Sequence, residues 1–162
     1  MKVLVAYGSK HGGTAGIADT VAEQLREDGL DVDVSPAGKA NKLDPYDAVV
    51  VGGALYRNRW HHDASMFVRR HKGELRQRPT YFFSSGPLGG AFSGHNAPPV
   101  PEVRLLANRV HAREHVTFNG SLPDHVNGFM DQKVAAVLAG DYRDRDEEKA
   151  WAHHVAEDVR TG

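Results

Sequence analysis

The chain has 162 residues, the length of one ordinary domain, and its 40% hydrophobic and 25% charged residues are typical of a globular protein. Its 20 Lys and Arg residues against 21 Asp and Glu residues leave a net charge of −1, which argues against a nucleic-acid binder. The absence of cysteine excludes disulfides, thiolate metal sites and cysteine nucleophiles. No apolar run approaches the length of a membrane span, and the N-terminus lacks the features of a signal peptide, so we expect a cytoplasmic protein.

Short apolar runs that end in Gly, Ser or Asn predict the strands of a parallel sheet. These runs lie at residues 2–7, 47–51, 80–83 and 115–118, and they contain the β-branched and aromatic residues of strands buried on both faces. Residues 30–34 alternate apolar and acidic side chains, which is typical of an edge strand with one polar face.

Amphipathic helices are predicted between and after these strands. Gly29 is expected to end the first helix, and a further helix is expected at residues 126–138. Side chains at helical spacing mark the first helix and three later ones. These side chains are Ile17, Val21 and Leu25 in the first helix; Phe67, Val68 and His71; Val103, Leu106 and Val110; and Trp151, Val155 and Val159. The alternation of strands and helices predicts one three-layer α/β domain over residues 1–162.

Charge is distributed unevenly along the chain. Residues 57–78 carry seven basic and two acidic residues, a local net charge of +5, whereas residues 141–158 carry three basic and seven acidic residues, a local net charge of −4. These segments are interpreted as solvated helix faces. The alternative is that the basic segment faces an anionic ligand or partner.

The loop after the first predicted strand is a candidate phosphate site. Ligands of open parallel sheets bind beyond the carboxyl ends of the strands, where backbone amides and a helix N-terminus attract phosphate. Thr14-Ala15 replaces the Lys-Ser or Lys-Thr pair of a nucleoside-triphosphate loop, so a single terminal phosphate is the expected ligand. The alternative is a glycine-rich turn without function. The candidate residues are Ser9, Lys10, His11, Gly12, Gly13 and Thr14.

Two further glycine-containing loops, residues 52–60 and 84–90, are expected at the same edge of the sheet. An aromatic side chain there can stack on a flat heterocycle, and the glycines allow the backbone to bind its rim. Tyr56 and Trp60 are the alternatives for stacking, and packing in the core is the other interpretation of Trp60. The candidates are Ala54, Leu55, Tyr56, Arg57 and Trp60 in one loop and Ser85, Gly86, Pro87, Leu88 and Gly89 in the other.

Other kinds of catalytic site receive little support from the residues. The ten histidines lack acidic or thiolate partners at the spacing of metal ligands, so no metal site is predicted. No Gly-x-Ser-x-Gly motif is present, which argues against a serine hydrolase of the α/β type. No side chain is predicted to act as a covalent catalyst. A phosphate loop flanked by two ring-binding loops is instead the arrangement that flavin mononucleotide (FMN) needs.

Three segments resemble the flavodoxin family in their expected order, namely VLVAYGSKHGGTAGIA, YDAVVVGGALY and TYFFSSGPLG. Ser9, Gly12 and Thr14 match the phosphate loop of that family, whereas His11 stands where a hydroxyl residue is usual. The resemblance implies a doubly wound sheet of five parallel strands in the order 2-1-3-4-5. It also implies FMN as cofactor and redox chemistry at the flavin ring.

The segment VVVGGALYRNRWHHDASMFVRRH is similar to the flavodoxin-like, menaquinone-dependent protoporphyrinogen oxidases. Those oxidases carry a longer aromatic and basic insert, whereas residues 120–129 here contain one aromatic residue and no Arg or Lys. We therefore expect an FMN-dependent redox protein whose partner is another protein or a quinone. One alternative is a protoporphyrinogen oxidase in which arginines pair with propionates; the other is an interaction domain without flavin. The arginines proposed for the first alternative are Arg57, Arg59, Arg69 and Arg70.

Overall fold

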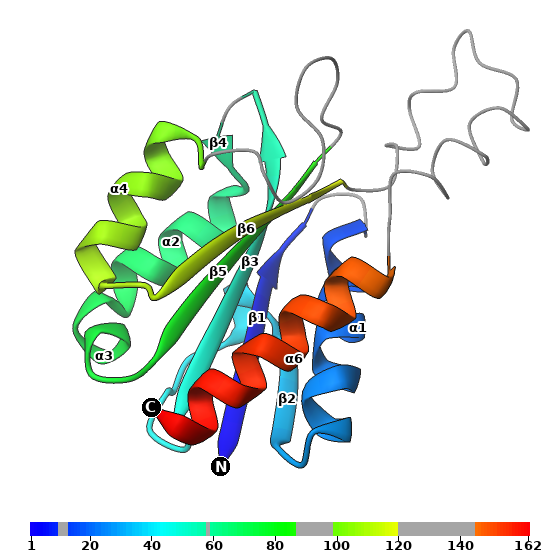
Figure 1. Ribbon diagram of the computed structural model, residues 1–162. Helices are drawn as coiled ribbons and strands as arrows, with labels where there is room; N and C mark the ends of the chain where they lie inside the picture. Colours follow the sequence, from blue (N-terminus) through cyan, green and yellow to red (C-terminus); the bar gives the residue numbers. More distant parts are fainter. Residues whose placement is uncertain (10–12, 58, 87–98, 120–144) are drawn as a thin grey trace, which may run out of the picture.

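The chain folds into three layers, with a central sheet between two layers of helices (Figure 1). The computed structural model describes residues 1–9, 13–57, 59–86, 99–119 and 145–162; the helix expected at residues 126–138 lies outside these ranges. The strands are β1 (Lys2–Gly8), β2 (Asp31–Pro36), β3 (Ala48–Tyr56), β4 (Arg59–Trp60), β5 (Thr80–Gly86) and β6 (Glu114–Asn119). The helices are α1 (Gly13–Glu27), η1 (Ala37–Lys39, a 3-10 helix), α2 (His62–Arg70), α3 (Lys72–Arg76), α4 (Pro101–Val110) and α6 (Arg145–Thr161).

The sheet has the strand order β2-β1-β3-β5-β6, and all neighbours in this path are parallel. This confirms the predicted order 2-1-3-4-5, since β5 and β6 are the fourth and fifth predicted strands. The short β4 is an addition that pairs antiparallel with β3, off this path. Because the five strands are parallel, their carboxyl ends meet at one edge, the upper edge in Figure 1.

Each face of the sheet packs against its own hydrophobic cluster. On β3, Ala48 and Val50 join the cluster under α1 and α6, whereas Val49 and Val51 join the cluster under α2, α3 and α4. Successive strand residues point to opposite faces, so a strand covered on both sides must be apolar at every position. This explains the uninterrupted apolar runs of the sequence.

Helix α1 ends as the sequence predicts. Gly29 has a φ of +93°, a backbone conformation that glycine adopts without strain. The Gly29 amide donates to the Arg26 carbonyl (2.9 Å), and the Leu30 amide donates to the Leu25 carbonyl (3.1 Å). These bonds satisfy the last carbonyls of the helix and direct the chain into β2.

Strand β2 forms one edge of the sheet, as predicted for residues 30–34. Asp31 is exposed, and the Asp33 carboxylate accepts a hydrogen bond from the Tyr46 hydroxyl (2.7 Å) and lies 3.5 Å from the Lys2 amine. The Arg26 guanidinium donates to the Val32 carbonyl (2.8 Å). Polar and charged groups therefore surround this edge.

The segment of residues 52–60 is not the loop that its glycines suggest. Strand β3 continues through Gly52 and Gly53 to Tyr56, turns at Arg57, where φ is +51°, and returns as β4. A Cβ atom at Gly52 would lie 2.0 Å from Cζ of Phe83, and one at Gly53 would lie 2.7 Å from Cδ1 of Trp60. These glycines make room for aromatic rings inside a strand, so they do not end it.

The segment predicted as the third loop also begins inside a strand, because residues 84–86 belong to β5.

In the described part of the chain, no helix combines the length and the apolarity needed to cross a bilayer.

Candidate functional site

The carboxyl ends of β1, β3 and β5 bring the predicted site segments together. The sheet register pairs Gly8 with Gly53 and Ala54 with Ser85, so the ends of three neighbouring strands lie side by side. The connection that leaves β1 leads to β2 on one side of β1, whereas the connection that leaves β2 leads to β3 on the other side of β1. Ligands of doubly wound sheets bind at such a topological switch point.

A buried pair of hydroxyls links the first helix to the central strands at this edge. The Thr14 Oγ1 atom in the first turn of α1 lies 2.6 Å from the Ser85 Oγ atom of β5. Two hydroxyls carry two protons, and one of them lies between the two oxygens, so one O–H remains to donate to a further acceptor. Both residues were predicted site residues, but the sequence did not indicate that they touch.

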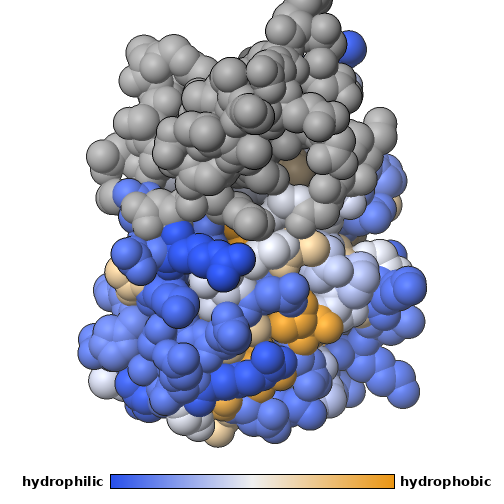
Figure 2. All heavy atoms as spheres, turned by 90° about the vertical axis from the view of Figure 1, so that its right-hand side faces the viewer, coloured by the Kyte–Doolittle hydropathy of each residue, from blue (hydrophilic) through white to orange (hydrophobic). Residues whose placement is uncertain are grey.

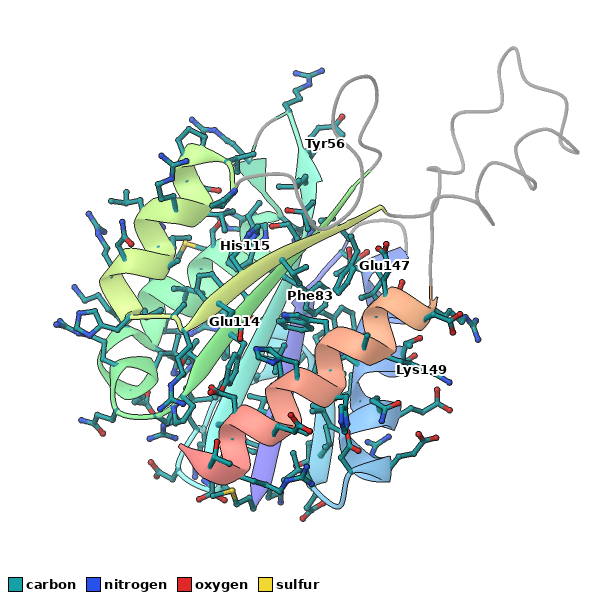
Figure 3. The ribbon with its side chains drawn as sticks, in the orientation of Figure 1. Tyr56, Phe83, Glu114, His115, Glu147 and Lys149 are labelled. Carbon is teal, nitrogen blue, oxygen red and sulfur yellow. The ribbon has the colours of Figure 1, made fainter. Side chains whose placement is uncertain are left out.

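The β3–β4 hairpin extends beyond the sheet and carries an exposed aromatic ring. Tyr56 is 56% exposed, and Figure 3 shows its ring at the upper end of β3. The Arg57 guanidinium carbon lies 5.6 Å from the centroid of that ring. Leu55 approaches the end of β5, since a Cβ atom at Gly86 would lie 3.1 Å from the Leu55 Cβ. The hairpin and the end of β5 therefore form one continuous surface.

Trp60 lies in the core rather than at the edge. Its ring centroid is 4.8 Å from that of Phe82, and its indole Nε1 donates to the Ser84 hydroxyl (3.0 Å). The indole fills the space that Gly53 leaves open. Trp60 is thus a packing residue, which was the other interpretation of this residue. Of the two candidates for stacking, Tyr56 is the one with an exposed ring.

The hydrogen bond of Trp60 continues to His115, a residue that the sequence analysis did not select. The His115 Nε2 atom lies 2.8 Å from the Ser84 Oγ atom, and Figure 3 shows His115 beside β6, on the side of α4. Burial lowers the pKa of His115 from 6.5 to about 4, so the imidazole is neutral at pH 7. A signal was present in the alternation of β6, which puts the His115 side chain on the face opposite to those of Glu114 and Val116.

We expect His115 to make stability fall as the pH drops from about 6.5 to about 4. The folded-state pKa lies below the unfolded value, so the unfolded chain binds more protons in this window and is stabilised relative to the folded chain. A His115→Gln variant should lose this dependence, worth roughly 2–3 kcal/mol between these limits. Urea denaturation of both proteins at several pH values measures it. Parallel profiles for the two proteins would contradict the assignment.

Glu102 in the first turn of α4 fastens the hairpin to the helices. Its Oε1 atom accepts hydrogen bonds from the Trp60 amide (3.0 Å) and the Ser65 hydroxyl (3.1 Å), and its Oε2 atom lies 3.8 Å from the Arg69 guanidinium. One carboxylate therefore joins β4, α2 and α4. Sequence reasoning missed this residue, because its partners lie about 33–42 residues away along the chain.

Several histidines that could suggest metal ligands have other roles. His61 accepts a hydrogen bond from the Asp63 amide (3.1 Å) and caps α2, while the His153 Nδ1 atom lies 3.0 Å from the carboxylate of Asp28, which follows α1. His154 contacts Glu114. Among the described residues, no three His, Asp or Glu side chains are grouped in a way that could hold a metal ion.

Six of the predicted site residues lie outside the described part of the chain, namely Lys10, His11, Gly12, Pro87, Leu88 and Gly89. Ser9 follows directly on β1, and Gly13 is the first residue of α1, so the N-terminus of α1 faces the same edge as the hydroxyl pair. The described residues thus combine donors for an anion with an exposed aromatic ring.

Comparisons with known proteins agree with this architecture. The profile of the flavodoxin domain matches residues 4–145. Protoporphyrinogen IX dehydrogenase (quinone) of Escherichia coli K12 is 30% identical over 145 residues, which are 88% of this chain and 70% of that protein.

Solved structures confirm the predicted fold. A flavodoxin from the domain Archaea superposes with a TM-score of 0.67 at 17% identity, covering 99% of both chains. A flavodoxin of Streptococcus pneumoniae TIGR4 superposes with a TM-score of 0.63 at 19% identity, also over 99% of both chains.

Proposed function

Since the chain belongs to the flavodoxin family of FMN-binding redox proteins, we propose that residues 1–162 form one such domain, which exchanges electrons with another protein or a quinone. The observation that carries this proposal is the meeting of the Thr14–Ser85 hydroxyl pair, the N-terminus of α1 and the exposed Tyr56 at one edge of the sheet. We place the protein in the cytoplasm as part of the same proposal.

The described residues fit FMN, which has a phosphate at one end and a flat ring at the other. The hydroxyl that the Thr14–Ser85 pair leaves over and the first amides of α1 suit the phosphate, and the exposed ring of Tyr56 suits the flavin. We assign the phosphate to Ser9, Lys10, His11, Gly12, Gly13, Thr14 and Ser85. We assign the ring to Ala54, Leu55, Tyr56, Arg57, Gly86, Pro87, Leu88 and Gly89.

Bound FMN supplies one- and two-electron transfer, and the protein supplies position and electrostatics. Glu102 holds the hairpin that carries Tyr56 against α2 and α4. The neutral His115 ends the hydrogen-bonded chain from Trp60 without adding a charge beneath the hairpin. Arg57 adds a positive charge beside Tyr56. No side chain needs to form a covalent bond to the substrate.

The visible absorption spectrum of the protein, purified without added flavin, tests the proposed cofactor. The two absorption bands of an oxidised flavin are expected, together with release of FMN rather than FAD on denaturation. A colourless protein that takes up no FMN on titration would overturn the proposal.

Oxidation of protoporphyrinogen is a second candidate function, favoured by the 30% identity to the E. coli dehydrogenase. In this function a quinone accepts the electrons, and Arg57, Arg59, Arg69 and Arg70 are available to pair with propionates, since all four are exposed. The test is oxygen-free turnover of protoporphyrinogen with a menaquinone analogue, measured as porphyrin fluorescence. Rapid turnover that is lost in the R57A/R59A variant would place this function first. A flavin-loaded protein that does not turn over protoporphyrinogen would instead favour electron transfer as the function.

We expect Arg57→Ala to lower the midpoint potential for full reduction of the flavin. Reduction adds negative charge to the ring, which a nearby guanidinium favours, so its removal should shift the potential by some tens of millivolts, by Coulomb's law in a partly solvated site. Anaerobic titration against reference dyes measures the shift. Arg109→Ala is the matched control, because this exposed arginine lies at the far end of α4. An equal shift in both variants would contradict the placement of Arg57.

A further inference from the structure

The two helical layers carry opposite charge. Helices α2, α3 and α4 have six basic and three acidic residues, a net charge of +3. Helices α1 and α6 have four basic and eight acidic residues, a net charge of −4. Figure 2 shows the side of α1 and α6, where hydrophilic residues cover most of the described surface. A chain of net charge −1 therefore carries charge of opposite sign on the two sides of its sheet.

Most cations of the basic layer point outward. We use the term α2–α4 surface for the exposed residues Met66, Arg69, Arg70, Lys72, Arg76, Arg104, Leu105 and Arg109. In the described part of the chain, Arg70, Lys72, Arg104 and Arg109 have no ion-pair partner, while Arg69 lies 3.8 Å from Glu102. Unpaired cations on one surface attract an anionic partner over a distance of about a Debye length.

The same surface exposes large hydrophobic side chains. Met66 on α2 is 42% exposed and Leu105 on α4 is 47% exposed, and only Met1 and Tyr56 join them among the exposed large hydrophobics of the described residues. Five of the six cations of the α2–α4 surface are arginines. Arg and Met are enriched in protein–protein interfaces, whereas Lys is depleted, so this composition fits a protein partner better than a solvated face.

The α2–α4 surface is continuous with the proposed flavin site. Helix α4 contacts β4 through the bond from the Trp60 amide to Glu102, and the β3–β4 hairpin carries Tyr56 at its end. Arg57 and Arg59 at this hairpin are exposed and extend the basic charge toward the carboxyl edge. A partner bound along α4 would thus reach the hairpin that we assign to the flavin ring.

We propose that the α2–α4 surface is the docking site for an acidic redox protein. The inference rests on the proposed exchange of electrons with another protein and identifies the charge of that partner. Complementary charge accelerates and orients such encounters, and the apolar side chains of Met66 and Leu105 supply the short-range contact.

The test uses the FMN-loaded, 15N-labelled chain and a plant-type two-iron ferredoxin as the acidic probe. Amide signals of α2, α3 and α4 should shift or broaden as ferredoxin is added, and those of α1 and α6 should not. Ferredoxin binding should weaken as the salt concentration is raised.

The R104E/R109E variant should bind ferredoxin at least tenfold more weakly than the unmodified chain. The matched control is R145E/K149E on α6, which changes the net charge by the same four units and should bind as the unmodified chain does. Basic cytochrome c should leave the α2–α4 signals unchanged.

Four outcomes would overturn the proposal. Two concern ferredoxin itself, namely equally weakened ferredoxin binding in both variants and ferredoxin-dependent shifts on α1 and α6. The other two are signal changes that arise from self-association without ferredoxin, and binding of phosphatidylglycerol vesicles but not of ferredoxin through Arg104 and Arg109. The flavin absorbance of each sample reports the cofactor separately. A chain that binds ferredoxin on α2, α3 and α4 but holds no FMN would contradict the proposed redox function and leave the docking surface standing.

Discussion

Replacing Gly52 by alanine is expected to lower the free energy of unfolding by about 2–3 kcal/mol, the cost of forcing an extra carbon into a filled core. The new Cβ would lie 2.0 Å from Cζ of Phe83 and 2.4 Å from the two neighbouring ring carbons. Phe83 has little room to move, because its ring also packs against Phe118 and Trp151, with centroids 6.0 and 6.2 Å away. Urea denaturation measures the change.

Gly73→Ala in α3 is the matched control for this substitution. A Cβ atom at Gly73 has nothing within 4 Å, and alanine is the better helix former, so a gain of up to about 1 kcal/mol is expected. If the clash with Phe83 causes the loss at Gly52, the double variant G52A/F83L should be less destabilised than the two single variants added together. A fully additive loss would show that the strain lies elsewhere.

Thr14→Val is expected to weaken FMN binding by about 10- to 100-fold and to leave riboflavin binding unchanged. A hydroxyl that donates to a charged phosphate is worth about 1.5–3 kcal/mol, and riboflavin has no phosphate to receive it. Ser85→Ala should weaken FMN binding less, because Ser85 acts through Thr14, which lies 2.6 Å away. Thr20→Val, on the same helix, removes a hydroxyl that donates to the Gly16 carbonyl and should change neither affinity.

Fluorescence titration of the apoprotein with FMN and with riboflavin measures these affinities. In the unmodified chain FMN should bind far more tightly than riboflavin. Equal affinity for both flavins would show that the loop before α1 does not bind phosphate. An equal loss of both flavins in Thr14→Val would instead assign Thr14 a purely structural role.

The fold could be predicted from the sequence because its main signals are local. The apolar runs in β1, β3 and β5 reflect burial on both faces, and the acidic alternation of β2 reflects an edge position. Strand β6, predicted as buried on both faces, instead ends the strand order and adds Val116 and Phe118 to one cluster only. The strand order came from the resemblance of whole segments to a family, since strand pairing joins residues that are far apart and leaves no local pattern.

The parts of the site that could not be predicted depend on contacts across the fold. Gly52 and Gly53 suggested a loop, because their need for space arises from Phe83 and Trp60 on other strands. Glu102 was not selected, and His115 was considered only among the histidines that could bind a metal. Their roles come from contacts with Trp60 and Ser84, which the fold brings near. Thr14 and Ser85 were selected separately, 71 residues apart, and only the folded sheet joins them.

The polar border of β2 has a consequence for the behaviour of the protein in a crowded solution. An open sheet edge is a template onto which a strand of another molecule can add, the first step of aggregation. Here Asp31 would place a charge against such a strand, Pro36 has no amide to donate, and the Val32 carbonyl already accepts a bond from Arg26. The β2 edge therefore resists the addition of a strand from another molecule.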